Sequence, residues 1–106
     1  MEFDGFLGSF YNDTDKNALL AANPDVVTAC LPHRKALCHV EDSQGVRYDS
    51  NVIYDETRAD PGLKYSAFIA GDNPYTEIVN GELTDGSACV VVKESFGNAF
   101  VPFLVD

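Results

Sequence analysis

Short hydrophobic runs separated by polar turns make up most of the chain, and the longest run lies near its end. Ala88 to Val92 is an unbroken apolar run rich in valine, which is typical of a strand buried on both faces. Beyond Lys93, apolar residues recur at intervals of three and four positions, as on one side of an amphipathic helix. The pattern therefore predicts a buried strand, a sharp turn that carries Ser95, and a helix from about Phe96.

The remaining runs predict one short helix followed by several short strands. The helix is expected at residues 15–22, because good helix formers there are followed by Asn23-Pro24. The linkers are too short for crossover helices, so the strands should pair antiparallel. We therefore predict an α/β fold, one edge of a larger sheet with an antiparallel β insertion. Strands are predicted at residues 26–31, 36–41, 46–48, 52–54, 65–70 and 75–79, turns at 42–45, 61–62 and 71–74, a hairpin at 80–81, and an extended aromatic arm at 1–12.

Length and charge exclude several classes of partner. A chain of 106 residues makes one small domain, and its 45% of hydrophobic residues can supply a core. The formal net charge is −10, from 17 acidic and 7 basic residues. Nucleic acid and anionic membrane surfaces are therefore not expected as partners, because both need a basic surface. The apolar runs are too short to cross a bilayer, and no signal peptide is evident.

The three cysteines form neither a zinc pattern nor a disulfide framework, because they are few, odd in number and widely spaced. Cys30 and Cys38 could pair if their segments were antiparallel neighbours, but both are expected to be free thiols. Cys89 falls inside the valine run and is interpreted as a small buried hydrophobic residue.

One acidic segment resembles the start of a calcium-binding loop. Asp13, Asp15 and Asn17 match the first three ligands, but Ala18 replaces the required glycine and Pro24 stands where the bidentate glutamate belongs. We interpret the segment as the capped start of a helix. No phosphate loop, haem site or dinucleotide fingerprint occurs, so neither metal nor cofactor is expected.

Ser95 is the candidate nucleophile, because it lies in a strand-to-helix turn where ligands gather in open α/β sheets. Backbone N–H groups near Gly97 and the side chain of Asn73 are candidate oxyanion donors. The alternatives are that Ser95 only caps the helix and that residues 71–74 form an ordinary turn. His33 and His39 are interpreted as solvated or structural, so the sequence offers no clear base.

Several blocks resemble one known family. Residues 93–104, K-E-S-F-G-N-A-F-V-P-F-L, are similar to the K-D-S-Y-G-N-x-F-x-P-F-L block of the DHHW proteins. These are bacterial cell-surface proteins related to SGNH hydrolases and alginate O-acetyltransferases. Three shorter blocks agree in the same order, F-L-G-S-F-Y-N at 6–12, N-P-D at 23–25 and F-I-A-G-D-N-P at 68–74.

The resemblance implies a flavodoxin-like, three-layer fold with Ser95 at the nucleophile position. In the acetyltransferase relatives the catalytic Asp and His lie upstream, in an Asp-x-His-Trp-type motif that this sequence does not contain. Glu94 also departs from the commoner Asp. We therefore expect residues 1–106 to be a single domain, the carboxy-terminal fragment of a larger SGNH-like domain that is inactive alone. The parent protein is expected outside the cell or at its surface.

Three hypotheses of function follow. The first is an acyl esterase or O-acetyltransferase that acts on cell-surface glycans. The second is a non-catalytic carbohydrate-binding or surface interaction module, in which Tyr54, Tyr65 and Tyr75 stack on sugars. The third is a structural piece that needs the rest of its chain, or a second copy, to cover its core. The expected partners are thus a glycan and the remainder of the parent chain or a homo-oligomer.

Overall fold

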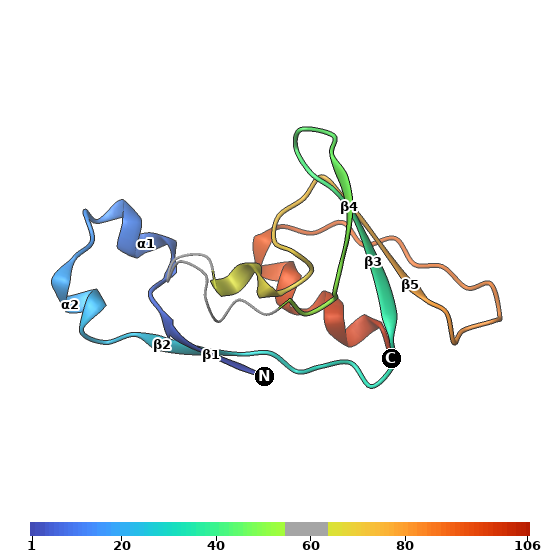
Figure 1. Cartoon of the computed structure of the whole chain (residues 1–106), viewed down its shortest axis with the longest axis horizontal. Helices are drawn as coiled ribbons and strands as arrows, with labels where there is room; N and C mark the ends of the chain where they lie inside the picture. The colour runs from blue at the N-terminus through green and yellow to red at the C-terminus, as the bar shows by residue number, and fades with distance from the viewer. Residues whose placement is uncertain (55–63) are drawn as a thin grey trace.

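The computed structural model describes residues 1–54 and 64–106 and shows an elongated arrangement of two small antiparallel sheets (Figure 1). The turn predicted at residues 61–62 lies outside the described residues. No helix within the two described ranges has the length and apolar character needed to cross a bilayer.

The first sheet pairs β1 (Glu2–Phe6) with β2 (Asp25–Thr28). Between them the chain forms two short helices, α1 (Gly8–Asp13) and α2 (Ala18–Ala21), which lie at one end of the molecule (Figure 1). The extended arm predicted for residues 1–12 is confirmed for Glu2–Phe6, where Phe3 docks in a core, and is wrong beyond it, because Gly8–Asp13 forms a helix. The helix predicted at 15–22 is shorter than expected, since Asp15 and Lys16 adopt positive φ angles of 50° and 58°.

The second sheet has three strands, with β3 (Ala36–Glu41) between β4 (Arg47–Ser50) and β5 (Tyr75–Asn80). The predictions of strands in these three places and of antiparallel pairing are confirmed. Alternation along β3 places Cys38 and Val40 on the inner face, where both are buried, and His39 on the outer face.

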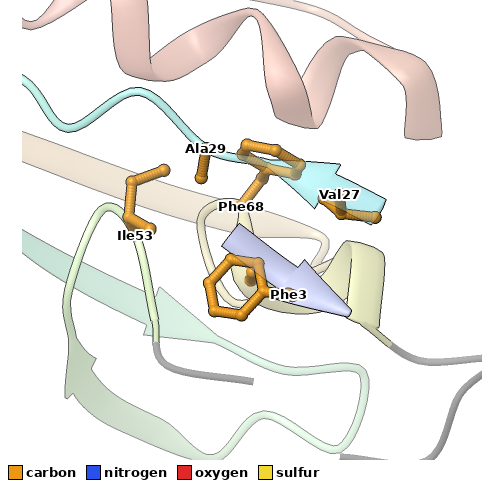
Figure 2. Packing of buried hydrophobic residues seen from close by; sticks show 6 residues of the cluster. Phe3, Val27, Ala29, Ile53 and Phe68 are labelled. Carbon is orange, nitrogen blue, oxygen red and sulfur yellow. The ribbon is translucent and has the colours of Figure 1, made fainter. Parts of the chain in front are cut away.

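Apolar side chains gather in two clusters. The first core lies on β1 and β2 (Figure 2) and consists of Phe3, Val27, Ala29, Ile53, Ala67 and Phe68. The second core lies under the inner face of the second sheet and consists of Cys38, Val40, Val52, Ile69 and Val105.

Two antiparallel segments, residues 52–54 and 67–69, join the two cores. Ile53 and Phe68 form a β-bridge, and Ile69 N–H donates to the Val52 carbonyl at 2.9 Å. Successive side chains of an extended chain point to opposite sides, so Val52 enters the second core and Ile53 the first. We call these two segments the junction.

The strand predicted at residues 65–70 is wrong. The chain there forms a short 3₁₀ helix, η1 (Lys64–Ala67), and only Phe68 makes a β-bridge. Ile69 and Ala70 have positive φ angles of 47° and 59°, which lie outside the range of a regular strand. The hairpin predicted at 80–81 is also wrong, because β5 pairs with β3 and no strand follows it in the described part of the chain.

The predicted flavodoxin-like, three-layer α/β fold is contradicted, because all strand pairs in the described residues are antiparallel. Residues 88–92 form no strand, and Val90 and Val92 are 90% and 95% exposed. The following helix is two 3₁₀ segments, η2 (Ser95–Ala99) and η3 (Val101–Leu104), with Pro102 in the second. An apolar run becomes a central strand only where other layers cover both faces, and the described residues supply none.

All three cysteines are free, but only Cys38 is buried, so the prediction of a buried Cys89 is wrong. Burial raises the pKa of the Cys38 thiol, which disfavours the reactive thiolate. We expect iodoacetamide to alkylate Cys30 and Cys89 in the native protein and to modify Cys38 only after denaturation. Peptide mass spectrometry measures this directly, and protection of Cys89 in the native state would contradict the exposed position of the valine run.

Candidate functional site

Ser95 is the first residue of η2, and its side chain is exposed. The preceding Glu94 is extended, and its carboxylate accepts a hydrogen bond of 3.0 Å from Phe96 N–H. Glu94 therefore performs the capping that was the alternative role for Ser95. No hydrogen bond of the Ser95 hydroxyl occurs within the described residues, so this oxygen is open to solvent and to a ligand.

Gly97 lies two residues beyond Ser95, and its N–H donates to the Glu94 carbonyl at 3.0 Å. A Cβ atom at Gly97 would stand 2.7 Å from the Lys93 Cβ, so any side chain here would force the turn open. The N–H groups of Phe96 and Gly97 are thus both occupied by Glu94. Gly97 explains the tightness of the turn, while its role as an oxyanion donor stays a prediction.

Asn73 stabilises its own turn. Its side-chain amide donates to the Ala70 carbonyl at 3.1 Å and to the Gly71 carbonyl at 3.5 Å. These bonds are those expected of an asparagine in a turn, the alternative interpretation of this loop. Its proposed role as an oxyanion donor also stays a prediction.

The neighbouring Asp72 connects this turn to η2. Asn98 is 2% exposed, and its amide donates to the Asp72 carboxylate at 2.9 Å. Lys93 Nζ lies 3.6 Å from the same carboxylate oxygen. The loop at 71–74 and the segment at 93–98, which are far apart in sequence, therefore meet through one carboxylate.

Asn98 was missed by sequence reasoning, although a polar residue between the apolar Phe96 and Phe100 was a usable signal. Its Oδ1 atom is buried and has no hydrogen-bond partner within residues 1–54 and 64–106. Exchanging the amide's oxygen and nitrogen would bring two oxygens together at Asp72, so the assignment is chemically sound. A buried acceptor without a donor costs free energy, so Asn98 is a residue whose presence needs an explanation.

Each histidine is paired with a carboxylate, which sequence reasoning did not foresee. His33 Nδ1 lies 3.4 Å from Asp106 Oδ2, and its side chain is 96% exposed. His39 Nδ1 lies 2.7 Å from Asp49 Oδ1 on the outer face of the second sheet. The backbone N–H groups of His33 and then Arg34 lower the pKa of Asp106, which therefore keeps its negative charge. Neither histidine contacts Ser95 in the described part of the chain.

No cluster suited to a metal ion occurs among the described residues. The described residues thus form a small two-sheet protein in which the exposed Ser95 lies at a tight turn, next to a buried asparagine that bonds a carboxylate. A family model described as "DHHW protein" matches residues 1–106, and the chain belongs to the DHHW family. No curated protein and no solved structure matches it.

Proposed function

We propose that this chain carries the nucleophile segment of an acyl esterase or O-acetyltransferase that acts on cell-surface glycans. The observation that supports the proposal is the open Ser95 hydroxyl at the start of η2. Membership of the DHHW family adds support, because the resemblance of residues 93–104 to a block of the DHHW proteins implies that Ser95 stands at the nucleophile position. The proposal also places the protein outside the cell or at its surface.

In the proposed reaction the Ser95 oxygen attacks the carbonyl carbon of an acetyl ester. A new carbon–oxygen bond forms, the hydroxyl proton passes to a base, and the leaving alcohol departs with a proton. The acetyl group then moves from Ser95 to water or to a sugar hydroxyl. Serine is weak without a base, and no serine–histidine pair occurs in the described residues. We therefore propose that a histidine outside residues 1–106 completes the site and that the chain alone turns over little substrate.

In the glycan-binding alternative three tyrosines stack on sugars, but one of them is already engaged within the protein. Tyr65 is half-buried, its ring packs edge-on against Phe68 at 5.2 Å, and its hydroxyl donates to the Phe96 carbonyl at 3.2 Å. Tyr54 and Tyr75 are 49% and 58% exposed. Tyr65 thus stabilises η2, and only the other two remain free to meet a sugar.

Chemical rescue tests the role of Ser95. The protein is incubated with p-nitrophenyl acetate with and without imidazole, which replaces the missing base. Peptide mass spectrometry then measures acetylation at each serine. We expect imidazole to raise acetylation of Ser95 by about tenfold or more. A general base held in place contributes at least about a hundredfold, and free imidazole should contribute less.

Ser95→Ala should abolish the acetylated peptide, whereas Ser9→Ala, at an exposed serine of α1, should leave it unchanged. Equal acetylation of Ser95 and Ser9 in wild type would show that Ser95 has no special reactivity. That outcome would remove the nucleophile proposal.

A further inference from the structure

A polar groove covers the outer face of the second sheet. Strand register places His39 between Asp49 and Glu77, and Glu41 between Arg47 and Tyr75. Directly opposed residues in antiparallel strands share one face, so these six side chains form two rows of three across the sheet. A cavity of about 840 Å³ lies over them, and all six line it. We call it the sheet groove.

Two contacts hold the polar groups of the sheet groove in place. His39 Nδ1 lies 2.7 Å from Asp49 Oδ1, and the other ring nitrogen makes no hydrogen bond within residues 1–54 and 64–106. Arg47 Nε donates to Glu41 Oε2 at 2.6 Å, and its remaining guanidinium nitrogens likewise make no hydrogen bond in these two ranges. Groups that are oriented in advance lose less conformational freedom when a ligand binds.

The charge of the sheet groove selects the ligand. Arg47 neutralises Glu41, and Asp49 is paired with His39. Glu77 makes no ion pair within the described residues, so the groove has an excess of negative charge. It therefore repels uronic acids, phosphates and other anionic ligands and attracts a protonated amine.

The shape and the aromatic group favour a sugar ring over a simple amine. Neighbouring strands are about 4.8 Å apart, so each row spans a flat surface comparable with one or two pyranose rings. Carboxylates, an imidazole and a guanidinium are hydrogen-bonding partners for ring hydroxyls. Tyr75, 58% exposed at the end of the second row, offers an aromatic surface to the C–H face of a sugar and to an ammonium group.

We propose that the sheet groove binds a positively charged amino sugar, a hexosamine unit with a free amine. Its cationic group would pair with Glu77 while the ring lies across β3 against Tyr75. The groove lies on the outer face of the second sheet, and no residue of the Ser95 turn is among its lining in the described part of the chain. The proposal therefore does not depend on the proposed acyl transfer.

Isothermal titration calorimetry in mildly acidic, low-salt buffer tests the proposal with three ligands. A short glucosamine oligosaccharide carries both ring and charge, the N-acetylglucosamine oligomer of equal length carries the ring alone, and spermidine carries charge alone. We expect the glucosamine oligomer to bind about tenfold more tightly than either of the others. Equal binding of the N-acetylated oligomer or of spermidine, or no binding of the glucosamine oligomer, would overturn the proposal.

Matched variants locate the site. Glu77→Gln should weaken binding about fivefold, the factor that corresponds to about 1 kcal/mol for an exposed ion pair. Glu82→Gln removes the same charge from an exposed position outside the groove and should change affinity little. Tyr75→Ala should also weaken binding, with an unchanged circular dichroism spectrum. Ser95→Ala should bind normally, so failure of the groove and failure of the nucleophile proposal are distinguishable. Equal effects of Glu77→Gln and Glu82→Gln would show general attraction by the acidic chain and would overturn the site.

Discussion

Phe3→Ala is expected to lower the free energy of unfolding by about 3–5 kcal/mol, the usual cost of removing a buried phenylalanine side chain. Phe3 is 0% exposed at the centre of the first core, where it packs with residues of β2 and the junction (Figure 2). The free energy of unfolding of a native protein is only about 5–15 kcal/mol, so this loss is a large fraction of the total stability. Urea denaturation followed by circular dichroism measures the difference.

Phe10→Ala is the matched control, because Phe10 is 70% exposed on α1. We expect it to change the free energy of unfolding by no more than about 0.5 kcal/mol. If the two variants lost the same stability, the first core would not be centred on Phe3.

Asn98→Asp is expected to have the second large effect. It should lower the free energy of unfolding by about 3–5 kcal/mol at neutral pH. The substitution puts a carboxylate in a buried position, removes the amide donor and sets a negative charge against Asp72, 2.9 Å from the atom it replaces. Both burial and the neighbouring charge raise the folded-state pKa of the new carboxyl above its unfolded value of about 3.9. The penalty is therefore absent below that pH, grows as pH rises and is complete above the folded pKa.

Asn98→Leu separates charge from the loss of the hydrogen bond. Leucine has a similar size, removes the unpaired Oδ1 and leaves Asp72, whose side chain is 63% exposed, in contact with water and Lys93. We expect the free energy of unfolding to change by about 1 kcal/mol or less, and by the same amount at acidic and neutral pH. Measuring urea unfolding of both variants at both pH values is decisive, and a pH-independent loss in Asn98→Asp would refute the buried-carboxylate explanation.

Local pattern was sufficient for the strands that are half buried. Residues 36–41 form β3 as predicted, because Cys38 and Val40 alternate with residues of the outer face. Residues 26–31 and 75–79 likewise contain most of β2 and β5. Along β3 and β5 the more buried residues alternate with more exposed ones, so the period of two is visible in the sequence.

Composition without alternation misled the interpretation at two places. Residues 65–70 have strand-like composition, but Ile69 and Ala70 take left-handed backbone angles that a regular strand does not contain. A buried strand at residues 88–92 was predicted from a run of valines, but the burial of such a run depends on neighbouring layers and not on the run itself. The predicted fold class depended on this strand, so the fold class was wrong for the same reason.

At the candidate site the sequence predicted a turn with a serine at its start, and Ser95 does begin η2 at the surface. It did not predict that Asp72 and Asn98 would meet, because that contact joins residues 26 positions apart. Nor did it predict that Glu94 would cap η2, since Ser95 was the stronger capping candidate by residue type.

The junction couples the unfolding of the first core to that of the second. Val52 and Ile53 are bonded neighbours that serve different cores, as are Phe68 and Ile69. When one residue of such a pair leaves its core, the backbone twists and moves the other residue out of the second core. The same movement breaks the hydrogen bonds between the two segments of the junction. The two halves of this protein are therefore expected to melt in a single cooperative transition, although each has an interior of its own.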